Sequence, residues 1–291
     1  MRFRLDRLDW KRLSEDRRLK LHIGMAVVLI IFFAFFIDIV FSVYKFKVYV
    51  EERPREKKTL KEKVRPPRRA KAEVAIILDD AGGNIPNYRE ICLIKEPLTI
   101  SVLPHMASSS TIAEAMKRSG FEVMLHLPME PENHAYVRSD GGMVVCDLSD
   151  EEIMKTVTDD LAFIKTAAGF NNHLGSKATK DERVMNAIFT CMKGKGLYFI
   201  DSRTSGGSLA GKIAKSFRIP SSDNNVFLDG VNSEAEIEGK FKYLVSIAEL
   251  HGTAVGIGHA TRVATINVLK KMMPVYARNG IKFVHASEIV K

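Results

Sequence analysis

The chain has few cysteines, and no spacing would let them act together. Among its 291 residues there are only three, Cys92, Cys146 and Cys191, and no two of them form a CxxC pair. An odd, scattered set of this kind argues against a disulfide framework and against a thiolate metal site. No GxGxxG turn follows the first apolar run of the folded part, and no GxSxG elbow surrounds Ser176 or Ser202. These two serines are therefore not interpreted as nucleophiles.

A basic folded domain is also lacking, although the formal net charge is +9. Residues 1–20 carry eight Lys/Arg against four Asp/Glu, and residues 45–71 carry twelve against four. Residues 72–291 hold 24 basic and 26 acidic side chains, which is close to neutral. Because domains that bind nucleic acid present a concentrated basic patch, the charge pattern argues against nucleic acid as a partner.

One long apolar run stands near the amino terminus. Residues 21–44 read LHIGMAVVLIIFFAFFIDIVFSVY, and 24 residues at about 1.5 Å each are enough to span a bilayer. No small-x-small cleavage site follows, so the run is interpreted as a retained transmembrane anchor. Residues 1–20 then form a basic amino-terminal segment. Residues 45–71 are a charged, proline-containing linker, either solvated or lying on anionic lipid headgroups. Equal numbers of Lys and Arg on the two sides leave the membrane orientation open.

From residue 72 onward, short apolar runs alternate with helical patterns. Strands are expected at 74–78, 98–103, 121–125, 197–200, 226–228, 254–257 and 282–284, with a short one near 173–174. Helices are expected at 87–95, 108–119, 149–168, 179–193, 208–215, 233–250 and 263–279. Ser149 and Glu152 predict a capping box. The alternation predicts parallel strands with crossover helices, so residues 72–291 are expected to form an irregular (β/α) barrel of seven to eight strands. A doubly wound open sheet is the alternative.

Polar residues follow the expected strands where each one ends. These endings hold Asp79 and Asp80, His105, His126, His173, Asp201 with Arg203, Asp229 and His259. The carboxyl ends of parallel strands meet at one edge, where α/β proteins place their chemistry. A single histidine there is most often a satisfied polar residue, but seven successive polar endings are hard to explain by packing. Aspartates and histidines without cysteine are the ligands that suit zinc or another divalent first-row cation.

The same endings lie in segments that resemble a known family. In chain order these segments are LDDAGG, LTISVLP, HLPMEP, NNHLGSKATKD, LYFIDSRTS, VFLD and GIGHA. They resemble the divergent polysaccharide deacetylase family, a remote branch of the carbohydrate esterase family 4 deacetylases, over about residues 74–290. The resemblance implies a deformed (β/α) barrel and metal-dependent removal of acetyl groups from an envelope glycan. It also implies an envelope location, so with the anchor we expect a single-pass inner-membrane protein whose folded domain is periplasmic.

The resemblance suggests roles for the first aspartate pair and for the metal ligands. In the better-known esterases, the first aspartate is the general base and the second binds the metal, which corresponds to Asp79 and Asp80. Those esterases take both histidine ligands from one HxxxH motif. Here Glu130 stands four residues after His126, and if the segment is extended the two are ~13 Å apart. His173 is therefore the better third ligand. The predicted metal ligands are Asp80, His126 and His173, with Zn²⁺ as the expected ion.

The remaining endings are assigned to proton transfer and binding. His259 is expected to protonate the leaving amine, with either Asp229 or Asp201 on its other nitrogen. Arg203 is expected to hold Asp79 ionised or to bind substrate. The alternative for Arg203 is a mutual ion pair with Asp201. Three protein ligands leave a position for water, which the ion would activate as the nucleophile.

Two functions of different classes follow. The first is a membrane-anchored, metal-dependent hydrolase that acts on an acetylated envelope polysaccharide or peptidoglycan. The second is a catalytically degenerate, metal-containing glycan-binding or scaffold protein, because fold and resemblance do not establish activity. The sequence leaves open the sugar, the oligomeric state, and whether Glu130 or His105 also contacts the metal.

Overall fold

A computed structural model describes residue 37 and residues 72–83, 87–133, 135 and 142–291. Apart from Ile37, the expected amino-terminal segment, transmembrane anchor and linker lie outside the described residues. Within the described ranges, the structure contains no helix that is both long and apolar enough to cross a bilayer.

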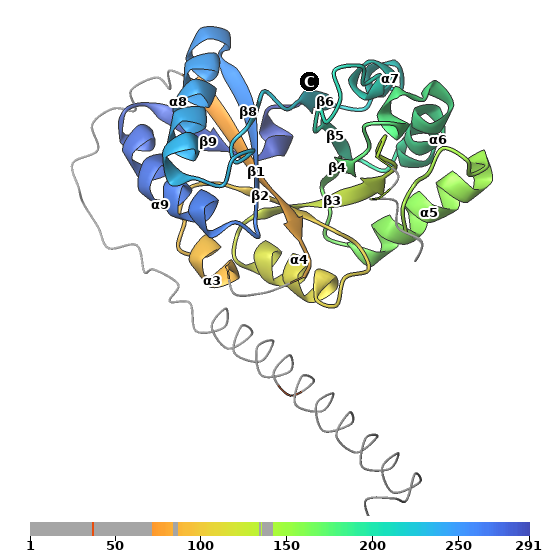
Figure 1. Cartoon of the computed structure of the whole chain (residues 1–291), viewed down its shortest axis with the longest axis horizontal. Helices are drawn as coiled ribbons and strands as arrows, with labels where there is room; N and C mark the ends of the chain where they lie inside the picture. Colours follow the sequence, from red (N-terminus) through yellow and green to blue (C-terminus); the bar gives the residue numbers. More distant parts are fainter. Residues whose placement is uncertain (1–36, 38–71, 84–86, 134, 136–141) are drawn as a thin grey trace, which may run out of the picture. The chain divides into compact units, whose positions relative to one another are not determined.

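The folded part alternates strands and helices along the chain (Figure 1). The strands are β1 (Ala72–Ala81), β2 (Thr99–Val102), β3 (Glu122–Met129), β4 (Gly169–Leu174), β5 (Tyr198–Asp201), β6 (Ser221–Asp223), β7 (Val226–Phe227), β8 (Thr253–His259) and β9 (Ile281–Val284). The α-helices are α3 (Tyr88–Ile91), α4 (Ser109–Arg118), α5 (Asp150–Phe163), α6 (Glu182–Met192), α7 (Ala210–Ser216), α8 (Glu234–His251) and α9 (Val263–Arg278). Two single turns of 3₁₀-helix are η2 (Ala178–Lys180) and η3 (Ala286–Glu288).

All strand pairs in the described residues are parallel, and they form one nine-stranded sheet. The strand order is β6-β5-β4-β3-β2-β1-β8-β7, which is the cyclic order of a (β/α) barrel opened between β6 and β7. β9 and β2 pair with the same edge of β1. β9 pairs with the first half of β1, and β2 pairs with its second half. The predicted parallel α/β architecture is confirmed, with one strand more than the seven to eight expected.

Alternate residues of the strands build the core on the inner face of the sheet. Ala75, Ile77 and Val255 belong to one buried apolar cluster, together with side chains from β3, β5 and β9. The intervening residues face the outer helices. At Gly256, a Cβ would lie 2.4 Å from Cδ2 of Leu244, so the glycine is required for the close approach of α8 to the sheet. The two faces of each central strand are therefore both apolar, as expected for a parallel sheet.

Two local features differ from the sequence expectations. β3 continues beyond residue 125 to Met129 and includes Pro128. The proline removes no bond of the β2–β3 ladder, because β2 pairs with β3 only as far as Leu125. β6 was not expected at all. It consists of Ser-Ser-Asp, and its pairing with β5 gives it extended geometry.

The capping box of Ser149 and Glu152 is present at the start of α5, as predicted.

Candidate active site

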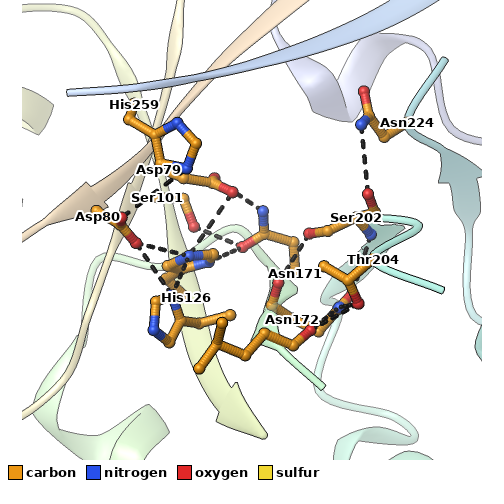
Figure 2. A network of polar contacts seen from close by, with 12 residues as sticks. Asp79, Asp80, Ser101, His126, Asn171, Asn172, Ser202, Thr204, Asn224 and His259 are labelled. Carbon is orange, nitrogen blue, oxygen red and sulfur yellow. Dashed lines mark hydrogen bonds and ion pairs between the residues drawn. The ribbon is translucent and has the colours of Figure 1, made fainter. Parts of the chain in front are cut away.

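The site lies at the carboxyl edge of the sheet and is built around the end of β1. Asp79 occupies the position that follows Ala75 and Ile77 on the inner face, so its side chain caps the apolar core. The next residue of a regular strand would point to the opposite face. Here the register of β1 against β2 shifts between Leu78 and Ala81, and Asp80 has φ of 60°. This irregularity turns both carboxylates into the same site (Figure 2).

The three predicted metal ligands converge, with their candidate ligand atoms all within 4.8 Å of one another. Oδ1 of Asp80 lies 3.2 Å from Nε2 of His126 and 3.0 Å from Nδ1 of His173. The two ring nitrogens are themselves 3.1 Å apart. Among the described residues, no donor meets the buried Oδ1 of Asp80 at a hydrogen-bonding angle. Three electron-pair donors that face one another in this way fit a divalent cation, and two imidazoles with one carboxylate form a zinc-type donor set.

The electrostatics of these groups also favour a cation. Burial works to raise the pKa of Asp80, but the neighbouring imidazoles of His126 and His173 outweigh it and hold that pKa below its ordinary value. For His126, burial lowers the pKa, but the carboxylates of Asp79 and Asp80 outweigh this effect and raise the pKa to about 9. The site therefore attracts positive charge. A proton and a metal ion compete for the same nitrogen lone pair.

Asp79 lies beside the predicted ligands and is shielded from solvent. Its side chain is 5% exposed, whereas that of Asp80 is 26% exposed. Oδ1 accepts a hydrogen bond of 2.9 Å from Nδ2 of Asn171, and Oδ2 lies 3.6 Å from Nε2 of His126. Burial raises the pKa of Asp79 above its ordinary value, against the lowering effects of His126 and Asn171. A buried carboxylate next to the predicted metal position has the environment that a general base needs.

His259 approaches from the opposite side and is paired with Asp229. Its Nδ1 lies 2.7 Å from Oδ1 of Asp229, and its Nε2 faces the site 3.9 Å from Oδ2 of Asp80. Asp229 is fully buried and also accepts from the His259 backbone N–H and the Thr265 hydroxyl. Burial lowers the pKa of His259, but the hydrogen bond and charge of Asp229 outweigh it and raise that pKa above its ordinary value. Of the two partners proposed for His259, the structure places Asp229 there.

In the part of the chain that the structure describes, Asp201 and Arg203 do not belong to the cluster formed by the predicted metal ligands, Asp79 and His259. Oδ1 of Asp201 accepts from the backbone N–H of Arg203, and Oδ2 accepts from the hydroxyl of Ser208. The Arg203 guanidinium lies 3.9 Å from both Asp201 and Asp223, and it forms no ion pair with Asp79. The structure therefore adopts the mutual ion pair that was the alternative for these two residues, and Asp201 is not the partner of His259.

Glu130 and His105 also contact groups outside the predicted ligand set. The carboxylate of Glu130 accepts 2.6 Å from the backbone N–H of Cys146 and 2.7 Å from Nζ of Lys177. Nε2 of His105 pairs with Asp160 at 2.8 Å. Both side chains are engaged elsewhere, and the second histidine of the predicted ligand set lies on β4 rather than in an HxxxH motif.

Sequence reasoning missed the residues that hold these groups in place. Asn171 and Ser101 lie fully buried beside Asp79 and His126, and Thr265 lies fully buried beside Asp229. Asn171 has one detectable signal. It stands two positions before His173, so strand alternation places both on the same face of β4. Ser101 and Thr265 carry no comparable signal, because serine and threonine are common in strands and at helix starts.

Gly258 gives a stability prediction. A Cβ there would lie 2.8 Å from Cγ2 of Thr265 and 3.4 Å from Oδ2 of Asp229. We expect Gly258→Ala to lower the free energy of unfolding by about 1–3 kcal/mol, because the start of α9 would have to move. Gly239→Ala is the matched control, since nothing lies within 4 Å of its Cβ position in α8. Denaturant unfolding of the wild type and both variants measures the free energy of unfolding. A Gly258→Ala variant as stable as the wild type would contradict the close packing of Gly258 against Thr265.

The fold and the site together define a class: a parallel (β/α)-barrel-like domain with an Asp-His-His cluster, a buried aspartate and a His–Asp pair at its carboxyl edge. Residues 76–290 match the model of the divergent polysaccharide deacetylase family, and the chain belongs to this family. The resemblance seen in the sequence is thereby confirmed.

Similar proteins extend over most of the folded part. The chain is 33% identical over 201 residues to an uncharacterized protein of Haemophilus influenzae, covering 69% of this chain and 71% of that protein. It is 29% identical over 201 residues to the uncharacterized protein YibQ of Escherichia coli, covering 69% of this chain and 62% of YibQ. The crystal structure of the uncharacterized protein Atu2773 of Agrobacterium tumefaciens superposes with a TM-score of 0.71 at 23% identity, over 83% of this chain and 95% of that chain. The similarity to Atu2773 shows that the two proteins share a fold.

Proposed function

We propose that this chain is a metal-dependent hydrolase that removes acetyl groups from an envelope polysaccharide or peptidoglycan. The observation that carries the proposal is the convergence of Asp80, His126 and His173 within 4.8 Å, beside a buried Asp79 and a His259–Asp229 pair. Membership in the divergent polysaccharide deacetylase family supports the type of substrate and bond.

The proposed chemistry divides the work among six side chains. Asp80, His126 and His173 hold a divalent cation, most simply Zn²⁺, which supplies the Lewis acidity that hydrolysis of an acetamide requires at neutral pH. Asp79 takes the proton of the attacking water. His259 delivers a proton to the leaving amine, and Asp229 keeps its imidazole oriented. Acid–base steps of this kind contribute about 10²–10⁴-fold each.

The exposure of the side chains agrees with this division. Asp80, His173 and His259 are each about one quarter exposed, at 26%, 25% and 26%, so a substrate can reach them from solvent. Asp79 and His126 are 5% and 3% exposed and lie below. The reacting amide would therefore approach the exposed edge of the cluster, with the base beneath it and the acid beside it.

We further propose that residues 21–44 anchor the chain in the inner membrane as a single span, with the folded domain on the periplasmic side. The support is the length of the apolar run and the absence of a cleavage site after it. The proposed side of the membrane rests on the envelope location that the sequence resemblance to this family implies.

Metal content and acetate release should be measured together on the purified full chain, before and after treatment with a chelator. The substrates are acetylated peptidoglycan fragments and chito-oligosaccharides. We expect about one metal ion per chain, acetate release that the chelator abolishes, and recovery on adding back Zn²⁺.

The other outcomes separate the alternatives. Bound metal without acetate release on these substrates favours a glycan-binding or scaffold protein, and binding of the same oligosaccharides then tests that function directly. If folded protein supplied with zinc takes up no metal, Asp80, His126 and His173 do not form a metal site.

A further inference from the structure

One buried amide connects the proposed base to a proposed metal ligand. Asn171 of β4 has no accessible surface and lies opposite His126 in the β3–β4 register. Its side chain is surrounded by Asp79 of β1, Ser101 of β2 and His126 of β3 (Figure 2). Four neighbouring strands thus contribute one side chain each to a hydrogen-bond network centred on Asn171.

The carboxylate of Asp79 determines which way the amide of Asn171 faces. An ionised carboxylate accepts hydrogen bonds and donates none. The amide therefore turns its Nδ2 group toward Oδ1 of Asp79, at 2.9 Å. With Nδ2 engaged in this way, Oδ1 of Asn171 must face the other side of the network.

The amide oxygen in turn determines the tautomer of His126. Oδ1 of Asn171 lies 2.7 Å from Nδ1 of His126 and 2.6 Å from Oγ of Ser101. An amide oxygen only accepts, so Nδ1 of His126 must carry the hydrogen. A neutral imidazole protonated on Nδ1 has its lone pair on Nε2. Nε2 is the atom that lies 3.2 Å from Oδ1 of Asp80 and 3.1 Å from Nδ1 of His173.

We propose that Asn171 is a positioning residue that holds His126 in the tautomer required for metal binding and at the same time holds Asp79 in place. The inference rests on the proposed metal site and deepens it. Groups that hydrogen-bond the second nitrogen of a metal-bound histidine orient the ring and strengthen the ligand. The amide of Asn171 also has a second role, because the same side chain connects the proposed ligand His126 to the proposed base Asp79.

Two variants separate the two halves of this role. Asn171→Leu removes all three hydrogen bonds of the amide at similar volume, and we expect its Zn²⁺ affinity to fall about 10–100-fold. Asn171→Asp keeps an acceptor for Nδ1 of His126 but places a second carboxylate against Oδ1 of Asp79, so the two share one proton and Asp79 is no longer a free base. We expect Asn171→Asp to bind Zn²⁺ much as the wild type does while its kcat/KM for acetate release falls. Calorimetric titration of the full chain with Zn²⁺ measures the affinities without any substrate.

The matched control is Asn186→Leu, the same substitution on α6, where the Nδ2 group donates to the backbone carbonyl of Glu182 outside the site. Its Zn²⁺ affinity should stay close to that of the wild type. The tautomer itself can be read from ¹⁵N NMR of histidine-labelled protein, since the two ring nitrogens differ in shift according to which one carries the hydrogen. We expect His126 to be protonated on Nδ1 in the zinc-bound wild type and in Asn171→Asp.

Three results would overturn the inference: wild-type Zn²⁺ affinity in Asn171→Leu, loss of affinity in Asn171→Asp equal to that in Asn171→Leu, or a His126 protonated on Nε2. Each is independent of the proposed reaction. A wild type that binds zinc but releases no acetate would refute the proposed function and leave the role of Asn171 in metal binding intact. If Asn171→Leu does not fold, Asn171→Asp and the NMR measurement still decide the matter.

Discussion

Asp79→Asn is expected to lower kcat/KM for acetate release by about 10²–10⁴-fold while metal affinity stays close to that of the wild type. The carboxylate is buried, and it is not one of the three converging ligands. An asparagine keeps one oxygen at the position that accepts from Nδ2 of Asn171, so the hydrogen-bond network around it is preserved. What the variant loses is the ability to take a proton.

The control for this variant is Asp159→Asn, the same chemical change on exposed α5, where the side chain pairs with Lys155. It should leave both metal affinity and turnover unchanged. Steady-state kinetics and zinc titration of the two variants give the comparison. Turnover that survives in Asp79→Asn would show that another group acts as the base. A loss of zinc would instead place Asp79 among the ligands.

His259→Gln is expected to have the second large effect, and the effect should depend on the leaving group. An amine leaves only when it is protonated, so kcat/KM for an N-acetylated sugar should fall by about 10²–10⁴-fold. A phenolate of low pKa leaves without a proton, so hydrolysis of 4-nitrophenyl acetate should be affected far less. Asp79→Asn, which acts on the attacking water, should impair both substrates.

The matched control is His251→Gln at the exposed end of α8, where the same substitution should change neither activity. Kinetics on the two substrates for the wild type and both variants complete the test. If His259→Gln lost activity equally on the sugar and on the aryl ester, His259 would not be the general acid. Its pairing with Asp229 would then serve to orient substrate or to shape the site.

Much of the site could be predicted because strand alternation carries chemical information. Asp79 and His259 stand two residues beyond Ile77 and Ile257, which belong to the inner apolar cluster. A polar residue at the next inward position cannot be packed into a core without a partner. The sequence therefore indicated which residues would meet at the carboxyl edge of the sheet, and Asp80, His126 and His173 do converge there.

The parallel architecture was predictable for a related reason. Apolar runs that carry no polar alternation must be buried on both faces, and between them the helical segments are long enough to cross back over the sheet. The boundaries were less predictable where pairing overrides composition. β6 has no apolar residue and is extended only because it pairs with β5, and β3 passes through Pro128 because β2 stops before it.

By itself, the sequence determined the class of fold, the family and the set of polar residues at the ends of the strands. Only the tertiary structure decided which of these residues act together. It paired His259 with Asp229 rather than Asp201, directed Arg203 toward Asp201 and Asp223, and brought Asn171 between Asp79 and His126. The physical reason is that such choices depend on register and on single backbone angles. A shift within β1 and a positive φ at Asp80 turn two consecutive carboxylates to one face, and no local pattern of residues encodes that.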